Sequence, residues 1–238
     1  MKKAFSRSST LLFFSAFFLF HSAVHAQLSE PVGKMLITDM NAYVSAATGV
    51  IGDLQTAINS SKATKDQVSL DVLEKAFTAR YQKNTGKAFD TKAAGLEGEA
   101  RKAFLASMLD VLEKAQPVLT KGGQDAFVPA HFRAQVLKKF SASMKGKIQG
   151  YATNRENELI NGDSGVDTVM KGSPFATDVK QWMSTGSLDP KEKKLDNRMI
   201  GYWPMKLGSN CVSCHARNGL NQKEGDFGGA LISELWLK

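Results

Sequence analysis

The chain has 238 residues, of which 42% are hydrophobic, and its 31 Lys and Arg against 23 Asp and Glu give a formal net charge of +8. This length suits one large domain or two small ones, and the composition is typical of a globular protein rather than a disordered one. The lysines are spread along the sequence with no basic stretch interleaved with aromatic residues, so the pattern does not favour nucleic-acid binding.

The amino terminus has the three parts of a secretory signal. A basic start is followed by an apolar run over residues 11–20 and a small-residue cleavage site that ends at Ala26. We therefore predict a cleaved signal peptide over residues 1–26 and a periplasmic, secreted product. No second hydrophobic run follows, so no membrane span is expected after cleavage. The mature chain would have a net charge of +5, and His131 and His215 would be its only histidines.

The region over residues 27–124 is expected to be helical. Apolar residues recur there at intervals of three and four, the spacing of an amphipathic helix. Thr64 and Gln67 resemble a capping box before the second helix, and Pro129 suits the first position of a fourth. Helices are predicted at residues 32–58, 70–81, 97–119 and 129–140.

Within the region over residues 125–238, the predicted secondary structure changes after about residue 140. Strands are predicted at residues 147–153, at 199–203 ending before Pro204, and at 230–237. Two helices are expected between them, at about 156–170 and 177–183. Helices first and short strands later predict an α+β fold with an antiparallel sheet and helices in the carboxyl-terminal half.

The two cysteines of the chain lie in the run Cys211-Val212-Ser213-Cys214-His215. This is the spacing that attaches a c-type haem: each thiol forms a thioether with a vinyl group, and the histidine ligates the iron. The alternatives are a redox or structural disulfide and a zinc site. A disulfide across two residues would close too small a loop to stabilise much, and zinc requires four ligands. We expect one covalently attached haem c held by Cys211, Cys214 and His215.

Several segments of the carboxyl-terminal half occur in a fixed order: 128–130, 154–157, 201–204, 211–215 and 228–232. That order resembles a bacterial family of secreted haem-c domains of unknown function. The resemblance covers roughly residues 125–235. It implies a PAS-like fold, with the haem bound late in the chain against the sheet. Members of the family occur alone or as the extracytoplasmic sensor part of histidine kinases.

The sixth coordination position of the iron stays open at this point. The resemblance implies that a cysteine can serve as distal ligand, but the chain has no third cysteine. His131, Met205 and no protein ligand are the three alternatives. A filled position favours one-electron transfer, whereas a vacant one admits a diatomic gas.

Other residues are candidates for the haem surroundings. Arg155 could pair with a propionate, since a guanidinium matches a carboxylate bidentately, or it could be a surface arginine. Tyr202, with Trp203 and Phe227, could form an apolar wall against the haem or be ordinary core.

Two function classes follow. The first is redox or gas sensing, in which a periplasmic signalling partner reads the state of the haem. The second is a soluble electron carrier or accessory subunit for a periplasmic redox enzyme. An enzymatic, peroxidase-like function is less favoured, because the sequence has no closely spaced distal His-Arg pair to assist peroxide cleavage.

Overall fold

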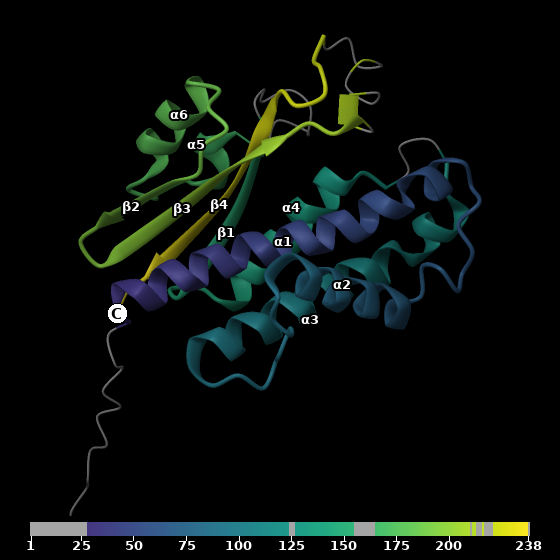
Figure 1. Cartoon of the computed structure of the whole chain (residues 1–238), viewed down its shortest axis with the longest axis horizontal. Helices are drawn as coiled ribbons and strands as arrows, with labels where there is room; N and C mark the ends of the chain where they lie inside the picture. The colour runs from purple at the N-terminus through teal and green to yellow at the C-terminus, as the bar shows by residue number, and fades with distance from the viewer. Residues whose placement is uncertain are drawn as a thin grey trace, which may run out of the picture.

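The structure, a computed structural model, describes residues 28–123, 127–154, 165–209, 211–212, 216 and 221–237. The predicted α+β fold, with a helical amino-terminal half and an antiparallel sheet with helices in the carboxyl-terminal half, is confirmed (Figure 1). The signal peptide predicted over residues 1–26 lies outside the described residues. The elements in chain order are α1 (Glu30–Asn59), α2 (Leu70–Thr85), α3 (Gly95–Lys121), α4 (Pro129–Ser143), β1 (Ile148–Asn154), α5 (Val166–Val169), α6 (Ala176–Ser184), β2 (Lys191–Leu195), β3 (Arg198–Lys206) and β4 (Phe227–Trp236).

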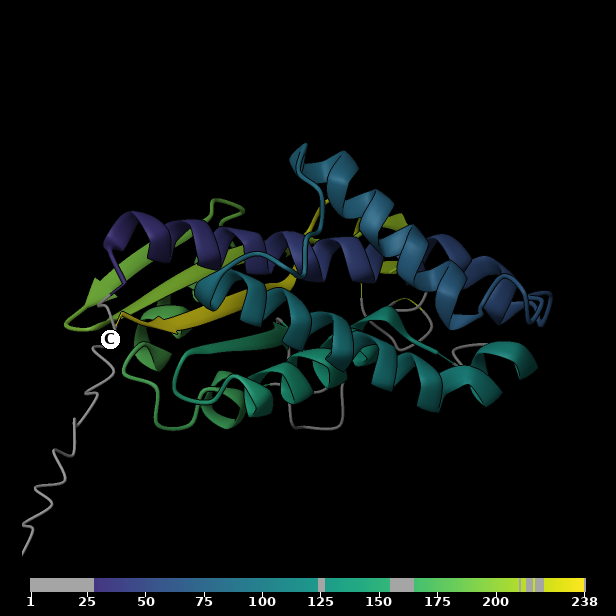
Figure 2. The same ribbon diagram turned by 90° about the horizontal axis from the view of Figure 1, so that it is seen from below.

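The sheet is a central layer with helices on both faces. Its strand order is β1-β4-β3-β2, and every neighbouring pair is antiparallel. α1 and α4 pack on one face, and α5 and α6 cover the other (Figures 1 and 2). β4 lies between β1 and β3 and is buried on both faces, which is why most of its side chains are apolar.

Side chains on the strands alternate between two hydrophobic clusters. Leu231 and Leu235 belong to the cluster shared with α1 and α4. Ala230 and Ile232 belong to the cluster that contains Phe175 and residues of α6. The alternation follows from the two-residue period of a strand, so each residue of β4 is assigned to a face by its position alone.

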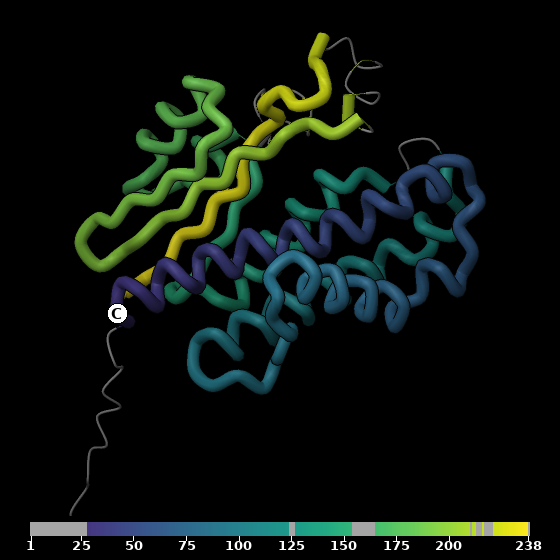
Figure 3. Tube along the Cα trace, viewed as in Figure 1, coloured from purple at the N-terminus to yellow at the C-terminus, as the bar shows by residue number. Residues whose placement is uncertain are grey.

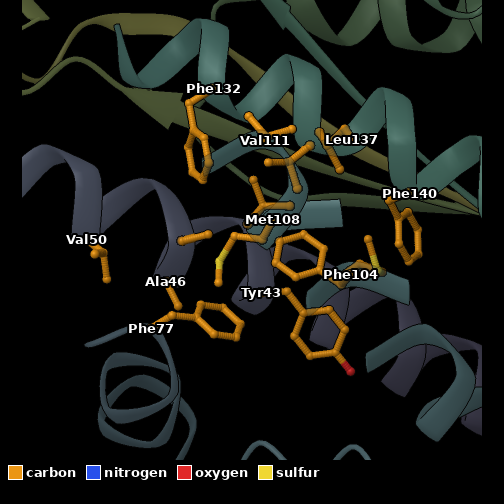
Figure 4. Close-up of a cluster of buried hydrophobic side chains, with 14 of the residues drawn as sticks. Tyr43, Ala46, Val50, Phe77, Phe104, Met108, Val111, Phe132, Leu137 and Phe140 are labelled. Atoms are coloured by element: carbon orange, nitrogen blue, oxygen red, sulfur yellow. The ribbon is translucent and has the colours of Figure 1, made fainter. Parts of the chain in front are cut away.

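The helical half is held together by a cluster of aromatic rings (Figure 4). Phe104 of α3 lies at its centre, with ring centroids 5.5 Å from Tyr43, 5.9 Å from Phe77 and 6.1 Å from Phe140. These rings come from α1, α2 and α4, and each such pair contributes about 0.5–1.5 kcal/mol beyond its buried area. One residue of α3 thus ties all four helices together.

α1 joins the helical layer to the sheet. It contacts α2, α3 and α4 and also β3 and β4. A Cβ placed on Gly33 would lie 2.9 Å from Leu237 Cδ2 and 3.2 Å from Leu235 Cδ2, so the absence of a side chain lets α1 approach the end of β4 closely. The start of α1 and the end of the chain therefore lie side by side (Figure 3).

β3 is longer than expected, because it does not stop before Pro204. Pro204 pairs with Ala230 of β4, and β3 continues to Lys206. β2 pairs with β3 only as far as Tyr202, so at Pro204 the strand has a neighbour on one side alone. A proline, which lacks the amide proton, is tolerated at such an edge.

Two further differences concern short segments. β2 was not predicted, because its Lys-rich sequence has no apolar alternation and four of its five residues are exposed. Thr64 and Gln67 do make the reciprocal bonds of a capping box, at 3.0 and 3.3 Å, but the helix begins at Leu70 and they close the turn before it.

The helix expected at residues 156–170 is found only as α5, since residues 155–164 lie outside the described part of the chain. The helix predicted at 177–183 is confirmed as α6. Across the ranges given above, no helix combines the length and the apolar character needed to cross a membrane.

Candidate functional site

The Cys-X-X-Cys-His segment lies in the connection between β3 and β4. The base of this connection is closed by two backbone hydrogen bonds: Leu207 N–H donates to Asp226 O at 2.9 Å, and Gly225 N–H donates to Leu207 O at 2.8 Å. Leu207 is buried, and a Cβ on Gly228 would lie 2.4 Å from Leu207 Cδ2. The connection thus leaves the sheet from a fixed base, at the end where β3 stops and β4 starts (Figure 1).

Cys211 is exposed, and its thiol is free. The amides of Cys211 and Val212 both donate to Gly208 O at 3.0 Å, which makes a short helical turn at the start of the motif. Cys214 and His215 lie outside the described residues. The first thiol of the motif is therefore presented outward, accessible to a group that would add to it.

Arg133 of α4 is the charged residue that best suits contact with a haem bonded to Cys211. Its guanidinium is close enough to Cys211 for a charge on that sulfur to act on it. The side chain is partly exposed, yet Nε is buried and has no hydrogen-bond partner in the described part of the chain. Burial lowers the pKa of Arg133 to about 10, and Cys211 acts in the opposite direction.

The position of Arg133 follows from the packing of α4 on β1. One turn further along, Leu137 fills the space above Gly150, where a Cβ would lie 2.5 Å from Leu137 Cδ2. Ser141, another turn on, exchanges hydrogen bonds with the backbone of Gly150. Residues four apart share a helix face, so Arg133 continues this row toward the end of β1 and the haem-motif connection. The sequence signal that could have found it is its place at the border of the apolar stripe of α4.

His131 lies in the first turn of α4 and is partly exposed. It precedes Arg133 by two residues, which on a helix places the two side chains on opposite flanks. His215 lies outside the described residues, so His131 as the sixth ligand of the iron stays a prediction.

Met205 and Trp203 lie near the end of β3 and pack, partly buried, against the cluster of α1 and α4. Tyr202 is on the other face, in the cluster with α5 and α6, and its ring lies 5.5 Å from that of Trp182. Its hydroxyl is buried without a partner among the described residues, and burial raises the pKa of Tyr202 to about 12. Phe227 belongs to the same cluster as Tyr202.

Arg155, proposed as a propionate partner, lies outside the described residues. The residues that the structure does describe fit a haem at the motif in two respects. Cys211 is an exposed thiol suited to a thioether bond, and Arg133, on whose charge Cys211 acts, offers an unpaired donor. A porphyrin with two carboxylates is a group that such a pair of residues can hold.

A surface pocket lies elsewhere in the described part of the chain. It has a volume of about 530 Å³ and lies between α1 and α2. Asp53 and Arg80 form an ion pair in its lining, and neither Arg133 nor Cys211 belongs to it. None of the residues that line this pocket belongs to the Cys-X-X-Cys-His segment, so we assign the pocket no part in haem attachment.

Comparison with known proteins adds no relative. No family model, no curated protein and no solved structure matches this chain. The resemblance to the secreted haem-c domains thus stays a prediction that depends on the quoted segments.

Proposed function

We propose that this chain is an exported protein with one haem c, which serves redox or gas sensing in the periplasm. Thioether bonds from Cys211 and Cys214 would hold the haem, and His215 would ligate its iron. The observation that carries the proposal is the Cys-X-X-Cys-His spacing on a connection whose first cysteine is a free, exposed thiol.

Each described residue has a definite task in this proposal. Cys211 offers its sulfur at the start of a helical turn. The short spacing would bring the second cysteine and the histidine to the same group. The hydrogen bonds of Leu207 keep the base of the connection in place. Once attached, the haem supplies one-electron chemistry and, where a coordination position is open, a place for a diatomic ligand.

A sensing role is supported by the path from the motif to α1. The connection is continuous with β3 and β4, whose side chains Met199 and Leu235 touch the start of α1. A Cβ on Gly33 would lie 3.3 Å from Met199 Sδ and 3.2 Å from Leu235 Cδ2. A shift of β3 against β4 would move the start of α1, where a signalling partner could read it. The proposed PAS-like arrangement and the resemblance to kinase sensor domains agree with this role.

The second candidate is a soluble electron carrier. The exposure of Cys211 favours it, because a haem bonded there would have an edge near the protein surface, where a redox partner can approach. Such a carrier would keep both axial positions of its iron filled.

The proposal is tested by producing the full chain in a host with haem attachment machinery. We expect a coloured product with the added mass of one haem that survives acid-acetone extraction. The double variant Cys211→Ala/Cys214→Ala should be colourless and of bare peptide mass. A colourless wild-type protein would refute the haem function.

Carbon monoxide separates the two roles. Ferrous wild-type protein that forms a carbon monoxide complex at low gas concentration supports sensing. A low-spin spectrum that carbon monoxide leaves unchanged supports electron transfer.

A further inference from the structure

The geometry points to Arg133 as the residue that holds a haem propionate, with its guanidinium as the counter-charge of the carboxylate. This inference rests on the proposed function, because it requires a haem at Cys211. It names a residue that the sequence pattern did not single out, on a helix far from the motif in the chain.

The first support is an unpaired donor. Arg133 Nε is buried and forms no hydrogen bond with any described residue. Buried polar groups in folded proteins are almost always hydrogen-bonded, and each exception requires an explanation such as a missing ligand. Arg133 therefore has the property expected of a residue whose partner is not part of the polypeptide.

The second support is an uncompensated charge. No described Asp or Glu acts on the charge of Arg133, and Cys211 is the one described group that does. With a pKa of about 10, the guanidinium is protonated near neutral pH. A shielded cation without an anion is costly, and a hydrogen-bonded carboxylate offsets that cost.

The third support is the contrast with two other arginines that are buried in full or in part. Arg101 is buried, and it pairs with Glu97 and Asp39 and hydrogen-bonds to Tyr43. Arg198 pairs with Glu234. The fold supplies a carboxylate to these two arginines, whereas no described carboxylate pairs with Arg133 and Cys211 is the described group that acts on its charge.

A propionate suits Arg133 better than an anion bound to the iron. The haem propionates are anionic in both oxidation states, so they would compensate the cation at all times. An exogenous ligand would do so only while bound. The planar guanidinium also matches a carboxylate through two parallel hydrogen bonds.

The inference is tested by measuring how Arg133→Gln changes the melting temperature of the protein with and without the haem. In the holoprotein, loss of the guanidinium should lower the melting temperature, because the propionate loses its partner. In the haem-free Cys211→Ala/Cys214→Ala chain, the same change should not lower it, because the unpaired cation is removed. Lys138→Gln, which removes an exposed charge from the same helix, should leave both forms unchanged.

A second readout follows the propionate directly. Without the nearby cation, ferric iron is relatively stabilised, so the reduction potential of Arg133→Gln should fall below that of the wild type. The propionate pKa should rise, which makes the potential decrease as pH increases between about pH 5 and 8. The propionate bending band in resonance Raman spectra should shift. Arg133→Lys, which keeps the charge, should retain a potential closer to that of the wild type.

The outcomes separate this inference from the proposed function. A colourless wild-type protein would end both. A haem-bearing protein whose potential and propionate band are the same in Arg133→Gln as in the wild type would overturn the role of Arg133 alone. The role of Arg133 would also be overturned if Arg133→Gln changed the affinity for cyanide but neither the reduction potential nor the propionate band. If the holo Arg133→Gln variant does not fold, Arg133→Lys and the haem-free measurement still decide: a loss of stability on Arg133→Gln in the haem-free chain contradicts the inference.

Discussion

Glu234 and Arg198 form an ion pair between β4 and β3, with Arg198 Nη1 3.0 Å from Glu234 Oε1. The side chain of Glu234 is 1% exposed and that of Arg198 is 31% exposed. The hydroxyl of Tyr151 donates a second hydrogen bond to Glu234 at 3.3 Å, and the Arg198 guanidinium lies over the ring of Trp236. The pair thus keeps a carboxylate inside the central strand of the sheet.

Replacing Arg198 by Ala should destabilise the protein by about 2–3 kcal/mol, since the buried carboxylate would lose its cation. The value is at the low end for a buried pair because Arg198 is partly exposed. Lys193→Ala is the control. It breaks the ion pair, at 2.7 Å, between Lys193 of β2, which is 43% exposed, and Asp178 of α6, and should cost less than about 1 kcal/mol. Urea unfolding of both variants is the measurement, and equal losses would contradict the assignment.

Gly98 and Gly52 should respond in opposite directions to substitution by Ala. A Cβ on Gly98 would lie 1.7 Å from the carbonyl oxygen of Ala93, a backbone atom that cannot move aside cheaply. Gly98→Ala should therefore cost more than about 2 kcal/mol despite the higher helix propensity of Ala. A Cβ on Gly52 meets nothing within 4 Å, so Gly52→Ala should stabilise the protein by about 0.5–1 kcal/mol. Thermal unfolding shows whether the signs differ as expected.

Asp39 is a buried carboxyl whose environment disfavours its charge. It lies 3.7 Å from Arg101 Nη2 and 4.0 Å from Lys87 Nζ, but its Oδ2 has no hydrogen-bond partner among the described residues. Burial raises the pKa of Asp39 above its ordinary 3.8, although Lys87 and Arg101 oppose the rise and Glu97 adds to it. A raised carboxyl pKa means that the folded state binds the proton more tightly than the unfolded state does.

The pH dependence follows from this sign. The contribution of Asp39 to stability is fully present below its ordinary pKa of 3.8 and is lost as pH rises through the raised value. Asp39→Asn, which carries no charge at any pH, should therefore be at least as stable as the wild type at pH 7. Any gain in stability of Asp39→Asn over the wild type should vanish as the pH falls below 3.8, the ordinary pKa of Asp39. Urea unfolding at both pH values is the measurement, and a loss at pH 7 as large as that of Arg198→Ala would contradict it.

His131→Ala should leave the absorption spectrum of the holoprotein unchanged. His131 lies on the flank of α4 opposite to Arg133, and Arg133 is on the side of Cys211. We therefore expect an imidazole on that flank to be directed away from Cys211, the proposed point of haem attachment. A change from low-spin to high-spin ferric iron in His131→Ala would show instead that His131 is the distal ligand.

The helices were predictable because their signals are local. The apolar spacing between Val32 and Ile58 repeats with the helical period, and α1 spans Glu30–Asn59. Pro129 marked the start of α4 correctly, since its fixed φ and missing amide suit a first helical position. The haem motif was equally local, because five adjacent residues define it.

β2 and the end of β3 were not predictable in the same way. β2 has no apolar face of its own and exists because β3 offers it an edge. Pro204 stays in β3 because β2 has already ended beside it. Both depend on which strands lie next to each other, which is not encoded in a short window of sequence.

The order of residues alone determined the helical half, the antiparallel sheet class and the expectation of a thioether-bound haem, because each depends on periodicity or on neighbours in the chain. The tertiary structure alone decided that Cys211 acts on the charge of Arg133, that Tyr202 faces α5 and α6, and that β3 and β4 touch the start of α1. Those relationships arise when α4 packs on β1 and β4 lies between β1 and β3. They join residues distant in the chain through the packing of whole elements, and the local spacing of residues does not encode that packing.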